Sequence, residues 1–159
     1  MRYSFALIVS LFLAACNNRK VTGVLETAVR NEVTKIYVND FAANGRITKT
    51  IEIDSLEIEK ISKKEYYEYE MKLQDTQFKK FLNYAKKSNL EYTFENQANH
   101  DKVMAYLQKT IKTASENPDI YKVDYYVRAT TQAGRYNQRE RTFLDSSIKK
   151  ISTDYSFLK

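Results

Sequence analysis

Ten consecutive residues near the C-terminus alternate between apolar and polar side chains, and they constrain the fold more than any other segment. The apolar members are Tyr121, Val123, Tyr125, Val127 and Ala129, and the polar ones are Lys122, Asp124, Tyr126, Arg128 and Thr130. A period of two is typical of a β-strand that is buried on one face. Ala133-Gly134 then supplies a turn, and residues 135–144 return as an antiparallel partner. This part of the chain is therefore predicted to be a β-hairpin.

The segment before the hairpin has the spacing of two helices. Ser62-Lys63-Lys64-Glu65 is a capping-box pattern, and it predicts a helix that runs to about Asn89. The apolar face expected for this helix consists of Tyr67, Met71, Phe78, Leu82 and Ala85. A second helix is expected to begin near Asn96 or Asn99 and to end before Pro118. Its expected buried residues are Val103, Leu107, Ile111 and Ala114.

Residues 21–41 are predicted to form a helix, and residues 47–62 a bent strand. Apolar residues recur at helical spacing from Val21 to Phe41, and Asn44-Gly45 suits a helix end because glycine adopts positive φ readily. The alternative is a hairpin around the same Asn-Gly, with strands near residues 35–41 and 47–53. Within residues 47–62 the apolar positions change parity at Asp54-Ser55, which predicts a bent or bulged strand or, alternatively, two short strands.

These segments together predict the α+β class. The expected architecture is an antiparallel sheet with a C-terminal β-hairpin packed against two to three helices, in the order α-β-α-α-β-β. This order, with a hairpin rich in Tyr and Val, resembles the cystatin-like and nuclear-transport-factor-2-like folds. The resemblance implies no particular site, because such folds serve many functions.

The N-terminus has the pattern of an export signal. Arg2 is the only charged residue in residues 1–15, and residues 5–13 are apolar apart from Ser10. A membrane-spanning helix needs about 20 apolar residues, so this run is too short to span a bilayer. A positive start, a short apolar centre and small residues before a cleavage site are typical of a secretory signal peptide. A buried N-terminal helix is the alternative, but the polar residues 17–20 end the apolar run abruptly.

The sequence Leu13-Ala14-Ala15-Cys16 resembles the lipobox of bacterial lipoproteins. The resemblance implies that Cys16 carries a diacylglyceryl group and that signal peptidase II cleaves between Ala15 and Cys16. It also implies a palmitate-type membrane anchor in the cell envelope. Asn17 replaces the Asp that commonly follows the cysteine in inner-membrane lipoproteins, which favours the outer membrane. The expected organisation is a signal peptide over residues 1–15, a lipidated tether over 16–20 and one globular domain over 21–159.

The composition excludes several classes of site. One Cys and one His exclude disulfide frameworks, Cys-rich zinc modules and multi-His metal sites. Three Gly, with no phosphate-binding motif among them, argue against a nucleotide cofactor. The formal net charge of +6 is spread along the chain without a block of like charges, so no nucleic-acid partner is expected. No cofactor, no metal and no catalytic residue is predicted.

Three groups of residues carry candidate chemistry. The first is acidic and interleaved with lysines, which is typical of a solvated surface: Glu52, Asp54, Glu57, Glu59, Glu65, Glu68 and Glu70. The second is His100, which is expected at the surface near a helix start, beside Asp101. The third is a candidate partner contact on the hairpin, formed by Tyr126, Arg128, Arg135, Arg139 and Arg141. The arginines could meet lipid headgroups, acidic glycans or an acidic protein, or could protect a sheet edge from pairing.

The function expected from the sequence is that of a lipid-anchored envelope lipoprotein. Its folded part would bind or scaffold another envelope component, a protein or a glycan, without catalysis. The alternative is an enzyme or a small-ligand binder that uses a pocket between the helices and the sheet.

Overall fold

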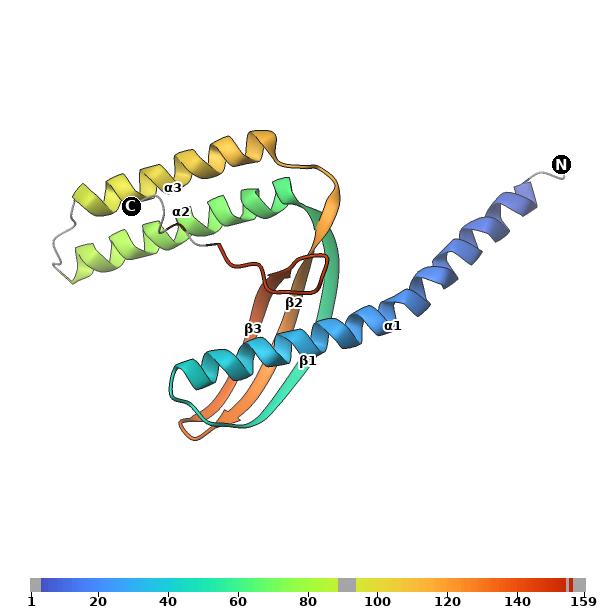
Figure 1. Ribbon diagram of the computed structural model, residues 1–159, viewed down its shortest axis with the longest axis horizontal. Helices are drawn as coiled ribbons and strands as arrows, with labels where there is room; N and C mark the ends of the chain where they lie inside the picture. Colours follow the sequence, from blue (N-terminus) through green and yellow to red (C-terminus); the bar gives the residue numbers. More distant parts are fainter. Residues whose placement is uncertain (1–3, 89–93, 154, 156–159) are drawn as a thin grey trace. The chain divides into compact units, whose positions relative to one another are not determined.

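The structure is a computed structural model that describes the backbone of residues 4–88, 94–153 and 155, and the side chains of residues 23–88, 96–153 and 155. Its elements are α1 (Ser4–Ala43), β1 (Thr48–Ser62), α2 (Lys63–Lys87), α3 (Phe94–Thr113), β2 (Pro118–Thr131) and β3 (Gly134–Leu144) (Figure 1). The strands form one antiparallel sheet in the order β1-β2-β3. The predicted α+β class and the order α-β-α-α-β-β are therefore confirmed.

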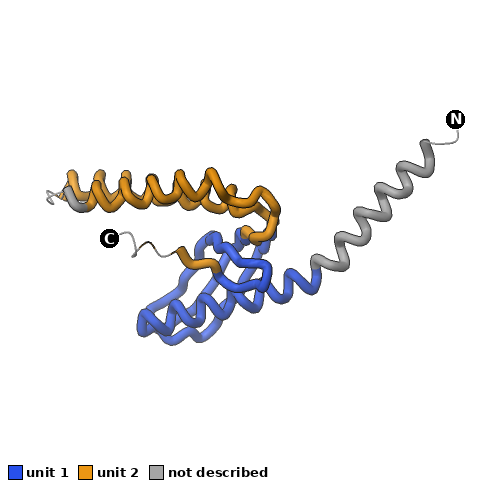
Figure 2. The backbone as a smooth tube through the Cα atoms, turned by 45° about the horizontal axis from the view of Figure 1, so that its top comes forward, with its two compact units in different colours: residues 1–58, 123–150 blue, residues 59–122, 151–159 orange. Residues whose placement is uncertain are grey.

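The chain divides into two compact units (Figure 2). The first unit comprises residues 1–58 and 123–150, and it contains α1, β3 and the greater part of β1 and β2. The second unit comprises residues 59–122 and 151–159, and it contains the helices α2 and α3.

The core of the first unit lies between α1 and one face of the sheet. Val29 and Val33 of α1 are fully buried, and Phe41 is 6 % exposed. The predicted alternation is present in β2, where Val123, Tyr125, Val127 and Ala129 are all buried. This burial explains why residues 21–41 fold as a helix, because their apolar stripe covers the hairpin.

The end of α1 confirms the predicted helix and shows that the alternative hairpin around Asn44-Gly45 is wrong. Gly45 has a φ of +67°, which is the left-handed conformation that glycine adopts without steric cost. The amide of Gly45 donates to the Ala42 carbonyl at 3.0 Å, and the amide of Arg46 donates to the Phe41 carbonyl at 2.8 Å. These bonds satisfy carbonyls that the end of the helix would otherwise leave unpaired.

The bend predicted in residues 47–62 is present within β1. Ser55 has a φ of +49°, although it lies in the middle of the strand. The less exposed apolar side chains occupy odd-numbered positions up to Ile53. Beyond Ser55 they occupy even-numbered positions, where Leu56 and Ile58 are half-buried. A left-handed residue in a strand is typical of a β-bulge, which turns the following side chains to the opposite face.

Replacing Ser55 by glycine is expected to raise the free energy of unfolding by about 0.5–1 kcal/mol. The left-handed region costs a residue with a Cβ about 1–2 kcal/mol, and glycine avoids this cost. Part of the gain is offset because glycine loses more backbone entropy on folding. Denaturant unfolding measures the change. Thr50→Gly is the matched control, because Thr50 lies in the same strand with an ordinary negative φ, and it should destabilise. Equal losses in both variants would contradict the left-handed conformation of Ser55.

The second unit is built on the helix pair α2 and α3. The capping box is confirmed: the Ser62 amide donates to the Glu65 carboxylate at 2.7 Å, and the Glu65 amide donates to the Ser62 hydroxyl at 3.2 Å. α2 ends at Lys87, and Asn89 lies outside the described residues. α3 ends before Pro118 as predicted, but it begins at Phe94, so Asn96 and Asn99 lie inside the helix and do not cap it. Leu107 of α3 is fully buried, as expected.

The predicted apolar face of α2 is partly wrong. Tyr66 is 3 % exposed and Ala85 is 2 % exposed, whereas Tyr67, Met71, Phe78 and Leu82 are half-buried. The Tyr66 hydroxyl shares a hydrogen bond with the Thr153 hydroxyl, which lies in the segment that follows the sheet. The burial of Tyr66 therefore depends on a distant segment that helical periodicity does not reveal.

A candidate binding groove along α1 and β1

The two residues predicted for lipidation and cleavage are Cys16 and Ala15, and both lie outside the residues whose side chains the structure describes. Among the residues that the structure describes, no helix combines the length and the apolar character that crossing a bilayer requires.

The hairpin places Tyr126 on the sheet face opposite α1. On the near face, Tyr37 of α1 contacts the rings of Tyr125 and Tyr136, with centroid distances of 6.1 and 6.2 Å. Because side chains alternate along a strand, Tyr126 points away from α1, and it is 36 % exposed as predicted. Tyr126 and Arg139 come together around a cavity of about 300 Å³, which Ser55 and Glu57 also line.

Three of the four predicted hairpin arginines are paired with carboxylates, and the fourth, Arg135, is exposed near the start of β3. Arg141 forms a bidentate ion pair with the buried Asp124, at 2.7 and 2.9 Å. Arg128 lies between two carboxylates of β1, that of Glu52 at 3.3 Å and that of Asp54. Arg139 lies 3.5 Å from Glu57. On the sheet face opposite α1, these arginines and carboxylates therefore neutralise each other's charge, although they form separate groups in the sequence.

Two residues expected at the surface are largely buried. His100 lies within α3, and its side chain is 14 % exposed, so the prediction of a surface position is wrong. Its ring stacks on Phe78 at a centroid distance of 3.9 Å, and neither ring nitrogen has a hydrogen-bond partner among the described residues. Glu70, expected on a solvated face, is 9 % exposed. Helical spacing could not reveal either position, because both depend on neighbours from other segments.

The burial of Glu70 changes its ionisation. Desolvation raises the pKa of this carboxyl, and the hydroxyl of Tyr155, which donates to Glu70 at 3.4 Å, offsets part of the rise. A group whose folded-state pKa exceeds its unfolded value stabilises the protein at low pH, and this contribution is lost as the pH rises through the folded value. The ionised form of Glu70 is therefore unfavourable in the folded protein at neutral pH.

Glu70→Gln is expected to raise the melting temperature at neutral pH. It should also make the melting temperature depend less on pH in the mildly acidic range. The amide keeps an oxygen that accepts from Tyr155, and it removes the charge that desolvation opposes. Thermal unfolding between pH 4 and pH 8 measures both effects. Glu68→Gln on the exposed side of the same helix serves as the control and should show neither effect. A lower melting temperature for Glu70→Gln at neutral pH would show that the Glu70 carboxylate stabilises the folded protein, which is the opposite of the prediction.

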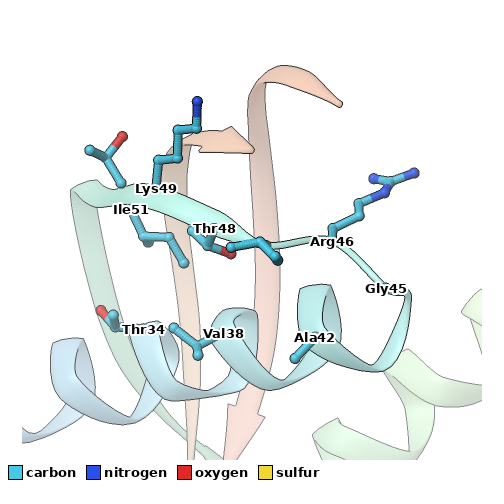
Figure 3. A pocket seen from close by; sticks show the side chains of 10 residues that line it. Thr34, Val38, Ala42, Gly45, Arg46, Thr48, Lys49 and Ile51 are labelled. Atoms are coloured by element: carbon cyan, nitrogen blue, oxygen red, sulfur yellow. The ribbon is translucent and has the colours of Figure 1, made fainter. Parts of the chain in front are cut away.

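A groove of the first unit runs along α1 and the start of β1, and it is larger than the cavities beside Tyr126 and His100. It has a volume of about 600 Å³. Thr34, Val38 and Ala42 line it from successive turns of α1, and residues 45–51 line it from the loop and β1. Figure 3 shows the side chains of Val38 and Ala42 directed from the helix toward the strand. The small side chains of α1 keep the groove open. Their spacing of four residues, on a helix face other than that of Val29 and Val33, is the sequence signal that could have revealed it.

The groove combines exposed apolar surface with positive charge. Val38 is 46 % exposed and Ile47 is 62 % exposed. Arg46 and Lys49 are the charged residues of the lining, and no carboxylate lines the groove within the described part of the chain. The Thr48 hydroxyl is buried and has no hydrogen-bond partner among the described residues. This arrangement can bind a ligand that carries apolar groups and negative charge.

The other cavity of comparable size lies on the second unit and has a volume of about 410 Å³. Its lining consists of Gln74, Gln77, Phe78, Phe81, Asn96, Asn99, His100 and Val103. Aromatic rings and side-chain amides thus surround the single histidine. Within the described ranges of the chain, no group of three or more His, Cys, Asp or Glu residues is arranged to hold a metal ion.

Comparison with known proteins finds no matching family model, no matching curated protein and no matching solved structure.

Proposed function

We propose that this chain is a lipid-anchored lipoprotein of the bacterial cell envelope whose folded part binds another envelope component without catalysis. The observation that carries the proposal is the N-terminal sequence: an apolar run that ends in Leu13-Ala14-Ala15-Cys16 and is followed at once by polar residues. The chain's one cysteine stands at the position where the lipobox pattern needs it. A lipid anchor would concentrate the domain at a bilayer surface, where it meets other envelope components.

The groove along α1 and β1 supports the binding part of this proposal. Exposed valine and isoleucine side chains offer apolar contact area, and the buried Thr48 hydroxyl can orient a ligand. The positive charges of Arg46 and Lys49 attract an acidic partner and speed its association. These are features of recognition, and they favour a binding role over a chemical one.

Mass spectrometry of the native protein tests the anchor. The expected N-terminal peptide begins at Cys16 and carries the added mass of a diacylglyceryl group, with or without a further acyl chain on its amino terminus. A peptide that retains residues 1–15 and a free thiol would overturn the proposal. Separation of inner and outer membranes then tests the assignment to the outer membrane.

The amide-rich cavity around His100 supports a second candidate function, the binding of a small polar ligand such as an envelope glycan. Sugars bind to aromatic rings and to side-chain amides, and both line this cavity beside His100. Titration with N-acetylglucosamine oligomers, followed by NMR of the His100 ring, tests this candidate. Unchanged His100 signals at saturating oligomer would exclude it.

A further inference from the structure

The strand that lines the groove lies at the edge of the sheet. In the order β1-β2-β3, the central strand is β2, so one side of β1 has no strand partner among the described elements. An edge strand presents a row of backbone donors and acceptors that can pair with another extended chain. Four consecutive residues of β1, residues 48–51, line the groove, so this part of the edge borders the cavity (Figure 3).

The dimensions of the groove fit an extended polypeptide. The extended part of its lining covers residues 48–51 of β1, which at about 3.3 Å per residue spans roughly 13 Å. A partner strand of about four residues has the same length, and the edge of β1 continues beyond the groove for a longer one. On the opposite wall, Val38 and Ala42 leave room for alternate side chains of such a strand to point toward α1.

The charges of the lining select the partner. Arg46 and Lys49 form no ion pair with any described residue. On the other sheet face, by contrast, Arg128, Arg139 and Arg141 are paired with carboxylates. Proteins that bind the C-terminal carboxylate of a partner usually do so with free backbone amides. The amides of Gly45 and Arg46 are not free for this, because they donate to carbonyls of α1. The groove therefore favours the side-chain carboxylates of Asp or Glu within a chain, in alternation with apolar residues.

We propose that an acidic, extended segment of another protein pairs with β1 as an additional strand and places its apolar side chains against α1. This inference deepens the proposed binding function and rests on it for the identity of the partner as an envelope protein. The hydrogen bonds of the strand edge would supply affinity that is independent of sequence. Val38, Arg46 and Lys49 would supply the specificity.

The experiment measures binding of synthetic peptides to the full-length protein in detergent by fluorescence anisotropy. The probe is an acetylated and amidated peptide of about seven residues that alternates Glu and Val, and its matched partner alternates Lys and Val. The Glu peptide is expected to bind at least about tenfold more tightly than the Lys peptide, because like charges across an interface are repulsive. Equal binding of the two peptides would overturn the proposal.

Methylation of peptide nitrogens tests strand addition directly. In a β-ladder, alternate residues of the added strand direct their amides toward the neighbouring strand, and the others point away. Methylation at one set of alternate positions should abolish binding, and methylation at the other set should preserve it. An equal loss from both sets, or no loss from either, would show that the peptide does not pair with β1.

The double variant Arg46→Glu/Lys49→Glu should reverse the preference in favour of the Lys peptide. The matched control is Lys109→Glu/Lys112→Glu, which makes the same change in net charge on exposed positions of α3 and should leave the preference unchanged. Circular dichroism establishes that both variants are folded. If the control reverses the preference as well, net charge and not the groove selects the peptide, and the proposal fails.

The test separates this inference from the proposed function. Lipid on Cys16 without peptide binding would overturn the groove proposal alone. Peptide binding by a protein that retains residues 1–15 would overturn the anchor alone. Sedimentation tests whether the purified protein forms dimers. If peptide binding is lost as dimers form, β1 pairs with a second copy of the chain, and the proposal of another protein as partner is overturned.

Discussion

Replacing Cys16 by alanine is expected to remove the protein from the stably membrane-bound fraction. The sulfur of Cys16 is the proposed attachment point of the lipid, and alanine offers no atom to which the diacylglyceryl group can be joined. Each buried methylene of an acyl chain contributes about 0.8 kcal/mol to membrane binding, and stable residence needs two chains or more. The variant should appear unlipidated in the soluble or inner-membrane fraction, and labelling with a radioactive fatty acid should be lost.

Two neighbouring variants serve as controls for this prediction. Asn18→Ala changes a polar residue beyond the lipobox and should leave lipidation and fractionation unchanged. Asn17→Asp keeps the cysteine and should still be labelled, but in a bacterium that sorts lipoproteins by the residue after the cysteine it should move to the inner membrane. A Cys16→Ala protein that remained membrane-bound with undiminished fatty-acid label would contradict the anchor.

The elements that the sequence predicts well are those whose signal is local. The capping box at Ser62 and Glu65 is formed by residues three positions apart, and the C-cap at Gly45 needs only a residue that tolerates positive φ. The bulge at Ser55 appears in the sequence as a change of parity within one strand. In each case the residues that determine the geometry are neighbours in the chain, so their pattern is sufficient.

The features that the sequence misses depend on segments that are far apart in the chain. The buried Tyr66 shares a hydrogen bond with Thr153, 87 positions away, and Glu70 accepts one from Tyr155, 85 positions away. The pairing of Arg128 with Glu52 requires the alignment of β2 with β1, which lies far away in the sequence. The sequence allowed for a pocket between the helices and the sheet but did not locate this groove, because the spacing of Thr34, Val38 and Ala42 on α1 does not show which strand lies opposite them.

Leu107→Ala is expected to destabilise the second unit by about 2–5 kcal/mol. The side chain of Leu107 is fully buried, with a solvent-exposed fraction of 0 %. Its truncation removes buried methylene groups and leaves a cavity that the surrounding helices fill only in part. At about 2–4 °C per kcal/mol for a chain of this size, the melting temperature should fall by roughly 4–20 °C.

The neighbouring variant Gln108→Ala is the control, because Gln108 is exposed and alanine is a better helix former than glutamine. It should change the free energy of unfolding by less than about 0.5 kcal/mol. Hydrogen exchange resolved by residue should locate the loss from Leu107→Ala in α2 and α3, since these helices belong to the same compact unit. A loss below about 1 kcal/mol would mean that Leu107 is not packed between the helices, because even a well-collapsed site loses the transfer free energy of the removed methylene groups.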